Sequence, residues 1–248
     1  MLLEVKDLDI SYGDKLTVTG ASLELDKGEI MSIVGESGSG KTTVIRAIMG
    51  CLPGAGRVSR GSITFDGKDV LQNTPEEWRK MYGSEMSMIF QDSGNMINPI
   101  RRIGQQFIDY VQAHQPDKSK DQAYKMCCDM LTNVRLPNPE NIMNSFPFEL
   151  SGGMRQRVGI AMAMIFSPKI LLADEPTSAL DVTTQAQIIR QIVDIRNEYD
   201  VAVIMVTHNL GVASYVSNKL MVMKVMLWNM ANVRTLSAIR RMIIQNNC

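Results

Sequence analysis

The segment from Gly35 to Thr43, Gly-Glu-Ser-Gly-Ser-Gly-Lys-Thr-Thr, constrains the fold of this chain most strongly. It fits the phosphate-binding pattern GxxxxGK[ST] at every fixed position. An apolar run typical of a buried strand, Ile30 to Val34, precedes it, and a stretch of helical character, Thr42 to Met49, follows it. The alternative, a glycine-rich turn whose lysine only caps a surface, explains neither flank. The pattern therefore predicts a strand, a phosphate loop and a helix in succession, with a site for ATP or GTP.

Each residue type in this segment has a physical reason to be there. Glycines allow backbone conformations that let successive N–H groups surround a phosphate, and the N-terminus of the following helix favours anions. Lys41 is expected to reach the β- and γ-phosphates, and the Thr42 hydroxyl to coordinate Mg²⁺. The whole loop is predicted to contact the nucleotide: Gly35, Glu36, Ser37, Gly38, Ser39, Gly40, Lys41, Thr42 and Thr43.

A second segment, Lys169 to Thr177, is an apolar run that ends in two adjacent carboxylates, Asp174 and Glu175. An α/β sheet places its site at the carboxyl ends of its strands. Asp174 is therefore expected to help hold Mg²⁺ through water, and Glu175 to polarise the water that attacks the γ-phosphate. Alone, such a pair would more often be a helix cap or a solvated turn. The phosphate loop upstream favours the catalytic interpretation.

Composition limits the class of protein. With 248 residues and 45% hydrophobic content, the chain is long enough for one domain with a smaller lobe. Lys plus Arg and Asp plus Glu are both 26, so no basic surplus favours a nucleic-acid partner. The chain has no uninterrupted apolar run of the roughly 18 to 20 residues that a membrane span requires. We therefore expect no nucleic-acid partner and a chain that stays on the cytosolic side.

The order of patterns predicts an α/β fold. Leu2 to Tyr12 and Thr17 to Leu25 alternate as antiparallel strands, and Ser62 to Phe65 enters a tight turn at Asp66-Gly67. Short apolar runs separated by helical patterns predict a mainly parallel sheet: Ile170 to Ala173, Val201 to Thr207 and Leu220 to Met223. Helix-like segments broken by prolines replace the strand pattern over about 91–165. The prediction is a P-loop NTPase core with an antiparallel β layer and an inserted helical lobe.

The segment from Leu150 to Arg157, Leu-Ser-Gly-Gly-Met-Arg-Gln-Arg, resembles the signature of ATP-binding-cassette (ABC) ATPases, with Met154 where Gln is commonest. Ser151, Gly152 and Gly153 before a helix form a second anion-binding N-terminus, although the chain already has a phosphate loop. In the family, the two anion-binding N-termini of one chain serve different nucleotides, because the subunits form a head-to-tail dimer in which each signature contacts the nucleotide of the other subunit. A lone Ser-Gly-Gly would otherwise be an ordinary helix start.

Other short motifs agree with this resemblance in type and order. It implies that Tyr12 stacks on adenine, that Gln91 senses Mg²⁺, the attacking water and the membrane partner, and that His208 contacts the γ-phosphate. It also implies that the loop Ser178 to Asp181 communicates across the dimer. Each of these residues taken alone would more often be structural or solvated. His114 matches no motif and is expected to be solvated.

The resemblance covers roughly Leu3 to Met223 and implies a nucleotide-binding domain over 1–223. Further matches narrow it to the subfamily of oligopeptide, dipeptide and nickel importers, although Phe148 stands where these commonly carry His. It implies a Mg²⁺-dependent ATPase at the cytoplasmic face of the membrane, paired with a second nucleotide-binding subunit, either a copy of itself or a related chain. Permease subunits would be direct partners, and an extracytoplasmic solute-binding protein an indirect one. Two alternatives are a soluble cassette ATPase acting on ribosomes or DNA, and a non-catalytic nucleotide-binding regulator.

The tail, 224–248, departs from the resemblance abruptly. With the reading frame displaced back by one base, the junction of Trp228 and Asn229 must code for Glu, and that of Met230 and Ala231 for Gly. Adjacent junctions permit Val and Tyr, which restores the Val-Glu-Tyr-Gly expected for the subfamily, and the Met242–Ile243 junction forces Asp. We expect an out-of-frame tail that leaves a core edge exposed, lowers stability and promotes aggregation. The alternative is a genuine basic amphipathic helix over Ala231 to Asn246.

Sequencing the DNA decides between these two origins of the tail. The bases at the third codon positions should spell Val-Glu-Tyr-Gly, and further on Asp-Tyr-Thr, in the displaced frame. Any other bases at those positions would mean that the tail is read in its own frame.

Overall fold

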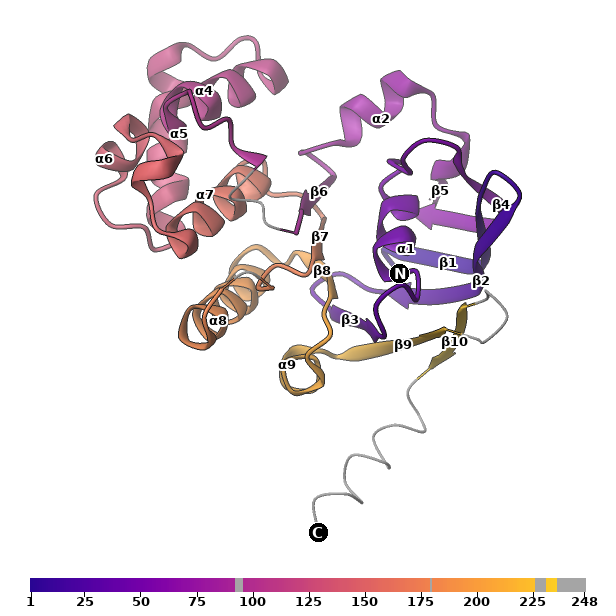
Figure 1. Cartoon of the computed structure of the whole chain (residues 1–248). Helices are drawn as coiled ribbons and strands as arrows, with labels where there is room; N and C mark the ends of the chain where they lie inside the picture. The colour runs from indigo at the N-terminus through magenta and orange to yellow at the C-terminus, as the bar shows by residue number, and fades with distance from the viewer. Residues whose placement is uncertain (92–95, 179, 226–230, 236–248) are drawn as a thin grey trace.

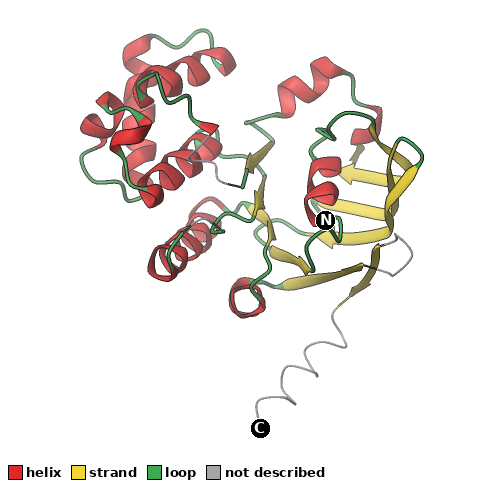
Figure 2. Ribbon diagram, viewed as in Figure 1, coloured by secondary structure: helices red, strands yellow, loops and turns green. Residues whose placement is uncertain are grey.

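The computed structural model describes 1–91, 96–178, 180–225 and 231–235 of the chain, which form two β-sheets and a set of helices (Figures 1 and 2). The strands are β1 Leu3–Tyr12, β2 Lys15–Leu25, β3 Ile30–Gly35, β4 Gly56–Phe65, β5 Lys68–Asp69, β6 Met86–Ile89, β7 Ile170–Asp174, β8 Ala202–Val206, β9 Lys219–Val225 and β10 Ala231–Thr235. The α-helices are α1 Lys41–Ile48, α2 Pro75–Met81, α4 Ile103–His114, α5 Lys120–Asn133, α6 Pro139–Asn144, α7 Gly152–Met164, α8 Val182–Tyr199 and α9 Leu210–Val216. Short 3₁₀ turns occur at Val70–Gln72 and Pro147–Glu149.

The smaller sheet is antiparallel, with strand order β2-β1-β4-β5. The predicted tight turn after Phe65 is present, because Asp66 and Gly67 both have positive φ, 48° and 79°, as a two-residue hairpin turn of the favoured hand requires. Strand β4 begins at Gly56, six residues before the predicted strand. Its first half contains Arg57 and Arg60 and has few apolar residues, so it lacks the alternation of apolar and polar residues by which a strand is predicted from sequence.

The larger sheet has the order β10-β9-β3-β8-β7-β6, with parallel pairing from β9 to β6. Strand β3 therefore lies inside the sheet, between β9 and β8, and carries the glycine-rich loop at its carboxyl end. The three predicted parallel strands correspond to β7, β8 and β9. Strand β6 was not predicted, because four residues without alternation are too short for a pattern. The α/β fold prediction, with a parallel sheet and an antiparallel layer, is confirmed.

The two faces of the parallel sheet pack against different helices. Leu171, Ala173 and Val203 share one core with buried residues of α4, α5, α7 and α8. Leu172 and Ile204 point the other way and share a second core with α1 and the antiparallel sheet. Successive residues of a strand point to opposite faces, so this split follows from the strand period. Helices α1 and α7 consequently lie on opposite faces of one sheet.

Helices α4 to α7 form a separate group, in which Phe107 is fully buried (Figure 1). Helix α5 begins at a capping box, in which the Ser119 hydroxyl accepts from the Gln122 N–H and the Gln122 side chain accepts from the Ser119 N–H. The proposed lobe boundaries near residues 91 and 165 remain predictions, because 92–95 lie outside the described residues. None of the helices in the described ranges combines the length and the apolar composition that a membrane span requires.

The C-terminal edge of the larger sheet differs from the expectation. Strand β10 pairs with β9 in antiparallel register, Ala231 opposite Val225 and Thr235 opposite Met221. The helix alternative is therefore wrong for 231–235, and the expected exposed edge of β9 is covered along this pairing. The residue types of this segment are compatible with a helix or with a strand. The unpaired edge of β9 therefore decides that it forms a strand. The junctions at 226–230 and the segment 236–248, which carry the rest of the frame argument, lie outside the described residues.

Candidate active site

The phosphate loop connects β3 to α1, as predicted. Gly40 takes φ 92° at the N-cap of α1, where the helix has no side-chain cap, so its first N–H groups can receive an anion. A Cβ at Gly40 would lie 2.6 Å from Cγ2 of Val18, which shows that the loop packs closely against β2. Glu36, Ser37 and Gly38 are exposed at the crest of the loop, while Ser39 is fully buried beneath it.

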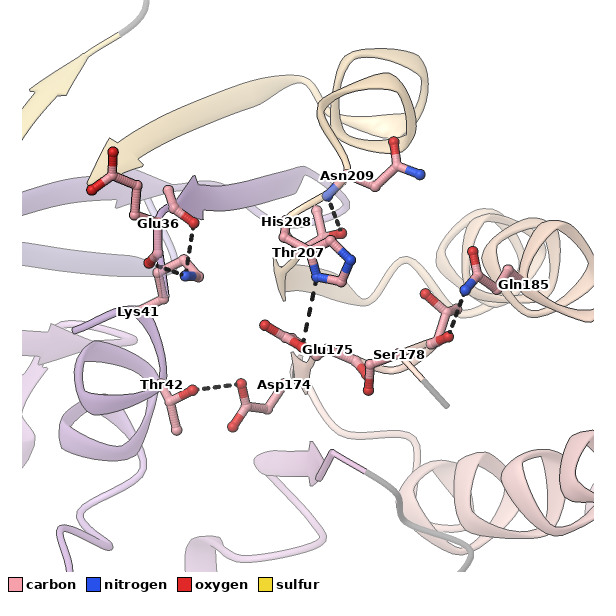
Figure 3. A network of polar contacts seen from close by, with 12 residues as sticks. Glu36, Lys41, Thr42, Asp174, Glu175, Ser178, Gln185, Thr207, His208 and Asn209 are labelled. Carbon is pink, nitrogen blue, oxygen red and sulfur yellow. Dashed lines mark hydrogen bonds and ion pairs between the residues drawn. The ribbon is translucent and has the colours of Figure 1, made fainter. Parts of the chain in front are cut away.

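Lys41 is turned back onto its own loop. Its Nζ donates to the carbonyl oxygens of Gly35 and Glu36 at 2.9 and 2.7 Å, and the residue is only 7% exposed (Figure 3). The ammonium group is thus held beside the exposed crest, where a bound phosphate would lie. Its contact with the terminal phosphates remains a prediction.

Thr42 and Asp174 meet although they are far apart in sequence. The Thr42 hydroxyl donates to Oδ1 of Asp174 at 2.8 Å (Figure 3). Burial raises the pKa of the Asp174 carboxyl above its usual value, while the Thr42 hydrogen bond and the charges of Arg46 and Lys41 act in the opposite direction. Asp174 as a residue is 2% exposed, so little solvent is available to balance the charge of its carboxylate. A divalent cation beside these two oxygens would supply that balance.

The site fits magnesium. Mg²⁺ is usually held by one or two carboxylates, a hydroxyl, water and the phosphates of a nucleotide, rather than by a cage of protein ligands. The Thr42 hydroxyl and the Asp174 carboxylate are such oxygen ligands. Within the described ranges, no group of three or more His, Cys, Asp or Glu side chains is placed to hold a metal alone. The third expected ligand, Gln91, is exposed and lies two residues beyond β6, beside the carboxyl end of β7.

Glu175 lies at the end of β7 in an unusual backbone conformation. Its φ is +45°, in the left-handed region, although it is neither glycine nor asparagine and precedes Pro176. A residue before proline favours the extended region, so this conformation is strained by about 1–3 kcal/mol. Oε2 of Glu175 lies 3.7 Å from Nδ1 of His208, which is itself 69% exposed (Figure 3). The two predicted catalytic side chains therefore lie next to each other and next to Asp174.

Two further predicted residues, Tyr12 and Asp181, lie at the ends of secondary-structure elements. Tyr12 ends β1 and packs against Gly56, in the antiparallel sheet that adjoins the phosphate loop. Asp181 caps α8, where its carboxylate accepts from the N–H and the hydroxyl of Thr184 at 3.0 and 2.7 Å. These hydrogen bonds hold the pKa of Asp181 below its usual value.

Ser151 is the N-cap of α7, where its hydroxyl accepts from the Met154 N–H at 3.3 Å. Ser151 and Gly152 are exposed, and Gly153 lies against Thr184 of α8. Because α7 and α1 lie on opposite faces of the parallel sheet, this second helix N-terminus is separated from the phosphate loop of the same chain. The structure therefore does not bring the two predicted anion-binding N-termini together within one chain.

The model of the family described as ABC transporter matches residues 18–178 of the chain. The chain belongs to the ABC transporter family. The resemblance noted in the phosphate loop and in the segment around Ser151 is thereby confirmed.

Within this family, the chain is similar to peptide transport proteins. It is 45% identical over 227 residues to the oligopeptide transport ATP-binding protein OppD of Bacillus subtilis, covering 90% of this chain and 63% of that protein. It is 43% identical over 226 residues to OppD of Escherichia coli, covering 90% and 66%. For the dipeptide transport ATP-binding protein DppD of Lactococcus lactis, the identity is 39%, with 90% and 65% covered. The chain thus spans about two thirds of the length of these relatives.

Solved structures of ABC cassettes share the fold. A dimeric ATP-binding cassette in a post-hydrolysis state, bound to ADP and Pi, has a TM-score of 0.79 at 24% identity, with 96% of this chain and 100% of that chain covered. The structure of cbiO1 from Clostridium perfringens, part of the cbiONQ transporter complex, has a TM-score of 0.79 at 23% identity, with 99% and 93% covered. These likenesses support the fold of this ABC family member.

One expectation about this ABC family member is wrong, because His114 is not solvated. It is half-buried at the end of α4, with Nδ1 3.0 Å from the Tyr110 carbonyl oxygen and Nε2 3.1 Å from the Tyr82 carbonyl oxygen. Its ring contacts those of Tyr110 and Phe166, with centroids 4.6 and 4.8 Å apart. The contact joins α4 to the turn before β6, and no short motif signals such a long-range pairing.

Replacing His114 by Ala should therefore destabilise the ABC fold by about 1–3 kcal/mol, because a hydrogen bond and ring packing are lost together. Thermal unfolding should shift downward by about 2–4 °C per kcal/mol for a domain of this size. The matched control is Asp117→Ala, at an exposed position three residues on. Equal melting temperatures for the two variants would contradict the structural role of His114.

Proposed function

We propose that this chain is the ATP-hydrolysing subunit of a membrane importer for small peptides, with nickel as the alternative solute. The observation that carries the proposal is the row of side chains at one sheet edge, Thr42 with Asp174 and Glu175 with His208, beside a phosphate loop. The names of the relatives, which are oligopeptide and dipeptide transport ATP-binding proteins, support the solute class. Localisation at the cytoplasmic face of the membrane follows from this role.

In the proposed reaction, ATP lies along the phosphate loop and its γ-phosphoryl group is transferred to water. Lys41 would neutralise the terminal phosphates, and Tyr12 would stack on adenine. Thr42, Asp174 and Gln91 would hold Mg²⁺, which neutralises charge on the β- and γ-phosphates when bound. Glu175 polarises the attacking water, and His208, 3.7 Å from Glu175, contacts the γ-phosphate.

We further propose that two cassettes act head to tail. The exposed N-terminus of α7 at Ser151 belongs to a helix on the opposite face of the sheet from α1, which supports a role in contacting a nucleotide held by another chain. Glycines at 152 and 153 leave its N–H groups accessible to a phosphate. The partner would be a copy of this chain or a related subunit, and the loop Ser178 to Asp181 would communicate across the dimer.

The partners of the proposed importer are permease subunits in the membrane and, through them, a solute-binding protein. The experiment is affinity purification of the full chain from membranes of its source, followed by uptake of labelled peptides or of Ni²⁺ into vesicles that hold the complex. We expect ATP-dependent peptide uptake. Co-purification with ribosomes or DNA, or absence of Mg²⁺-dependent ATP hydrolysis, would instead support the soluble ATPase or the non-catalytic regulator.

A further inference from the structure

The strained conformation of Glu175 needs neighbours that hold it. Its N–H donates to the Val206 carbonyl oxygen at 3.1 Å, and its own carbonyl oxygen accepts from the N–H and the hydroxyl of Ser178, both at 3.2 Å. Strained residues persist only where surrounding contacts over-determine them. These bonds fix both sides of Glu175, but they leave the following residue, Pro176, to be held from elsewhere.

Gln156 of α7 supplies the contact to Pro176. Its Nε2 donates to the Pro176 carbonyl oxygen at 2.8 Å, and the residue is 4% exposed. A buried hydrogen bond of this kind is costly to leave unmade, because neither group can turn to water instead. Gln156 lies on the buried side of α7, five residues after the helix N-cap at Ser151. The bond therefore ties the helix of the second anion-binding N-terminus to the residue directly after Glu175.

We infer that Gln156 is a positioning residue for hydrolysis, which holds the Glu175 carboxylate in its working place by fixing the carbonyl of Pro176. This inference rests on the proposed ATPase function. Without the bond, the Pro176 carbonyl is no longer fixed, and the strained backbone of Glu175 is held only by its bonds to Val206 and Ser178. It can then shift partway toward the extended region that a residue before proline prefers. Such a shift would move the carboxylate away from His208 and from the γ-phosphate. A displacement of about 1 Å can already reduce turnover about a hundredfold.

The test compares Gln156→Met with Gln191→Met in the full chain. Gln191 is a matched control, because it is also 4% exposed and also donates from Nε2 to a backbone carbonyl oxygen, that of Val134, at 2.9 Å. Its acceptor, however, lies outside 174–178. Methionine keeps the length and volume of glutamine and removes the donor. Of the two variants, only Gln156→Met should affect the catalytic carboxylate.

For Gln156→Met we expect kcat to fall about ten- to a hundredfold while the Kd for ATP, measured without hydrolysis, stays within about twofold. Gln191→Met should keep the wild-type kcat. Equal kcat values for Gln156→Met and the wild type, or an equal loss in the two variants, would overturn the inference. If Gln156→Met does not fold, Gln156→Asn serves instead, since its amide is one methylene too short to reach Pro176.

A second readout separates this inference from the proposed function. Amide hydrogen exchange of the peptide that spans 174–178 should be faster in Gln156→Met than in the wild type and unchanged in Gln191→Met. Wild-type protein without ATPase activity would contradict the proposed function, but the exchange comparison would still decide the positioning role. Unchanged exchange in Gln156→Met would overturn the inference whatever the activity.

Discussion

Replacing Lys41 by Ala should reduce ATP hydrolysis by about a hundredfold or more, with weaker ATP binding. The substitution removes the charge expected to lie on the terminal phosphates, where electrostatic stabilisation supplies the largest part of catalysis. It also removes two hydrogen bonds that hold the loop, to the carbonyl oxygens of Gly35 and Glu36. Steady-state hydrolysis and equilibrium binding of a fluorescent ATP analogue measure the two effects.

The control for this prediction is Lys80→Ala, on the exposed surface of α2, where the side chain makes a 3.8 Å ion pair with Glu76. It removes the same charge and should leave hydrolysis unchanged, because an exposed pair of this kind contributes little. ATPase activity unaffected by Lys41→Ala would be incompatible with the assignment of the phosphate loop.

Replacing Glu175 by Gln should nearly stop hydrolysis, again by about a hundredfold or more, while ATP still binds. Glutamine keeps the shape of the side chain and should tolerate φ +45° no worse than glutamate does, so the backbone is not expected to change. It lacks the carboxylate that polarises water. ATP should therefore accumulate in the composite sites, and the head-to-tail dimer should persist. Size-exclusion chromatography with and without saturating ATP measures this directly.

Glu76→Gln, at a side chain 65% exposed on α2, removes a carboxylate that is not a predicted site residue, and it is the control. It should hydrolyse ATP normally and show no ATP-stabilised dimer beyond that of the wild type. A Glu175→Gln variant that turns over at the wild-type rate would contradict the role of Glu175. If this variant binds ATP but elutes as a monomer, the composite site is wrong.

The parts of the fold that sequence alone predicts are those encoded locally. Strands β3, β7 and β8 are short runs of apolar residues buried on both faces, and such runs stand out in any pattern. The sequence did not predict strand β6 or the first half of β4, and the reason differs between the two. Strand β6 is four residues long, and β4 starts with arginines on an exposed face. Whether a segment such as 231–235 forms a helix or a strand depends on the edge of β9 beside it, which no local pattern encodes.

Part of the candidate site can be predicted from local sequence motifs, and part depends on contacts that form only in the folded chain. Motifs identify Lys41, Thr42, Asp174 and Glu175 as residue types, because phosphate and Mg²⁺ require those groups. The strained φ of Glu175 and the bond that fixes Pro176 depend on a helix that begins some twenty residues earlier in the chain. The contact of His114 with the turn before β6 likewise appears only after the chain has folded.

The position of β3 inside the parallel sheet has a consequence for synthesis of the protein. Ile30 of β3 pairs with Val203 of β8, and Met31 pairs with Lys219 of β9, so both neighbours of β3 come about 170 to 190 residues later in the chain. At roughly 5–20 residues per second, a ribosome needs on the order of ten to forty seconds to deliver them. During that interval the phosphate loop, although made among the first residues, has no completed sheet to hold it. The nucleotide site should therefore form late in folding. ATP in the cell should bind only chains in which β8 and β9 have already paired with β3.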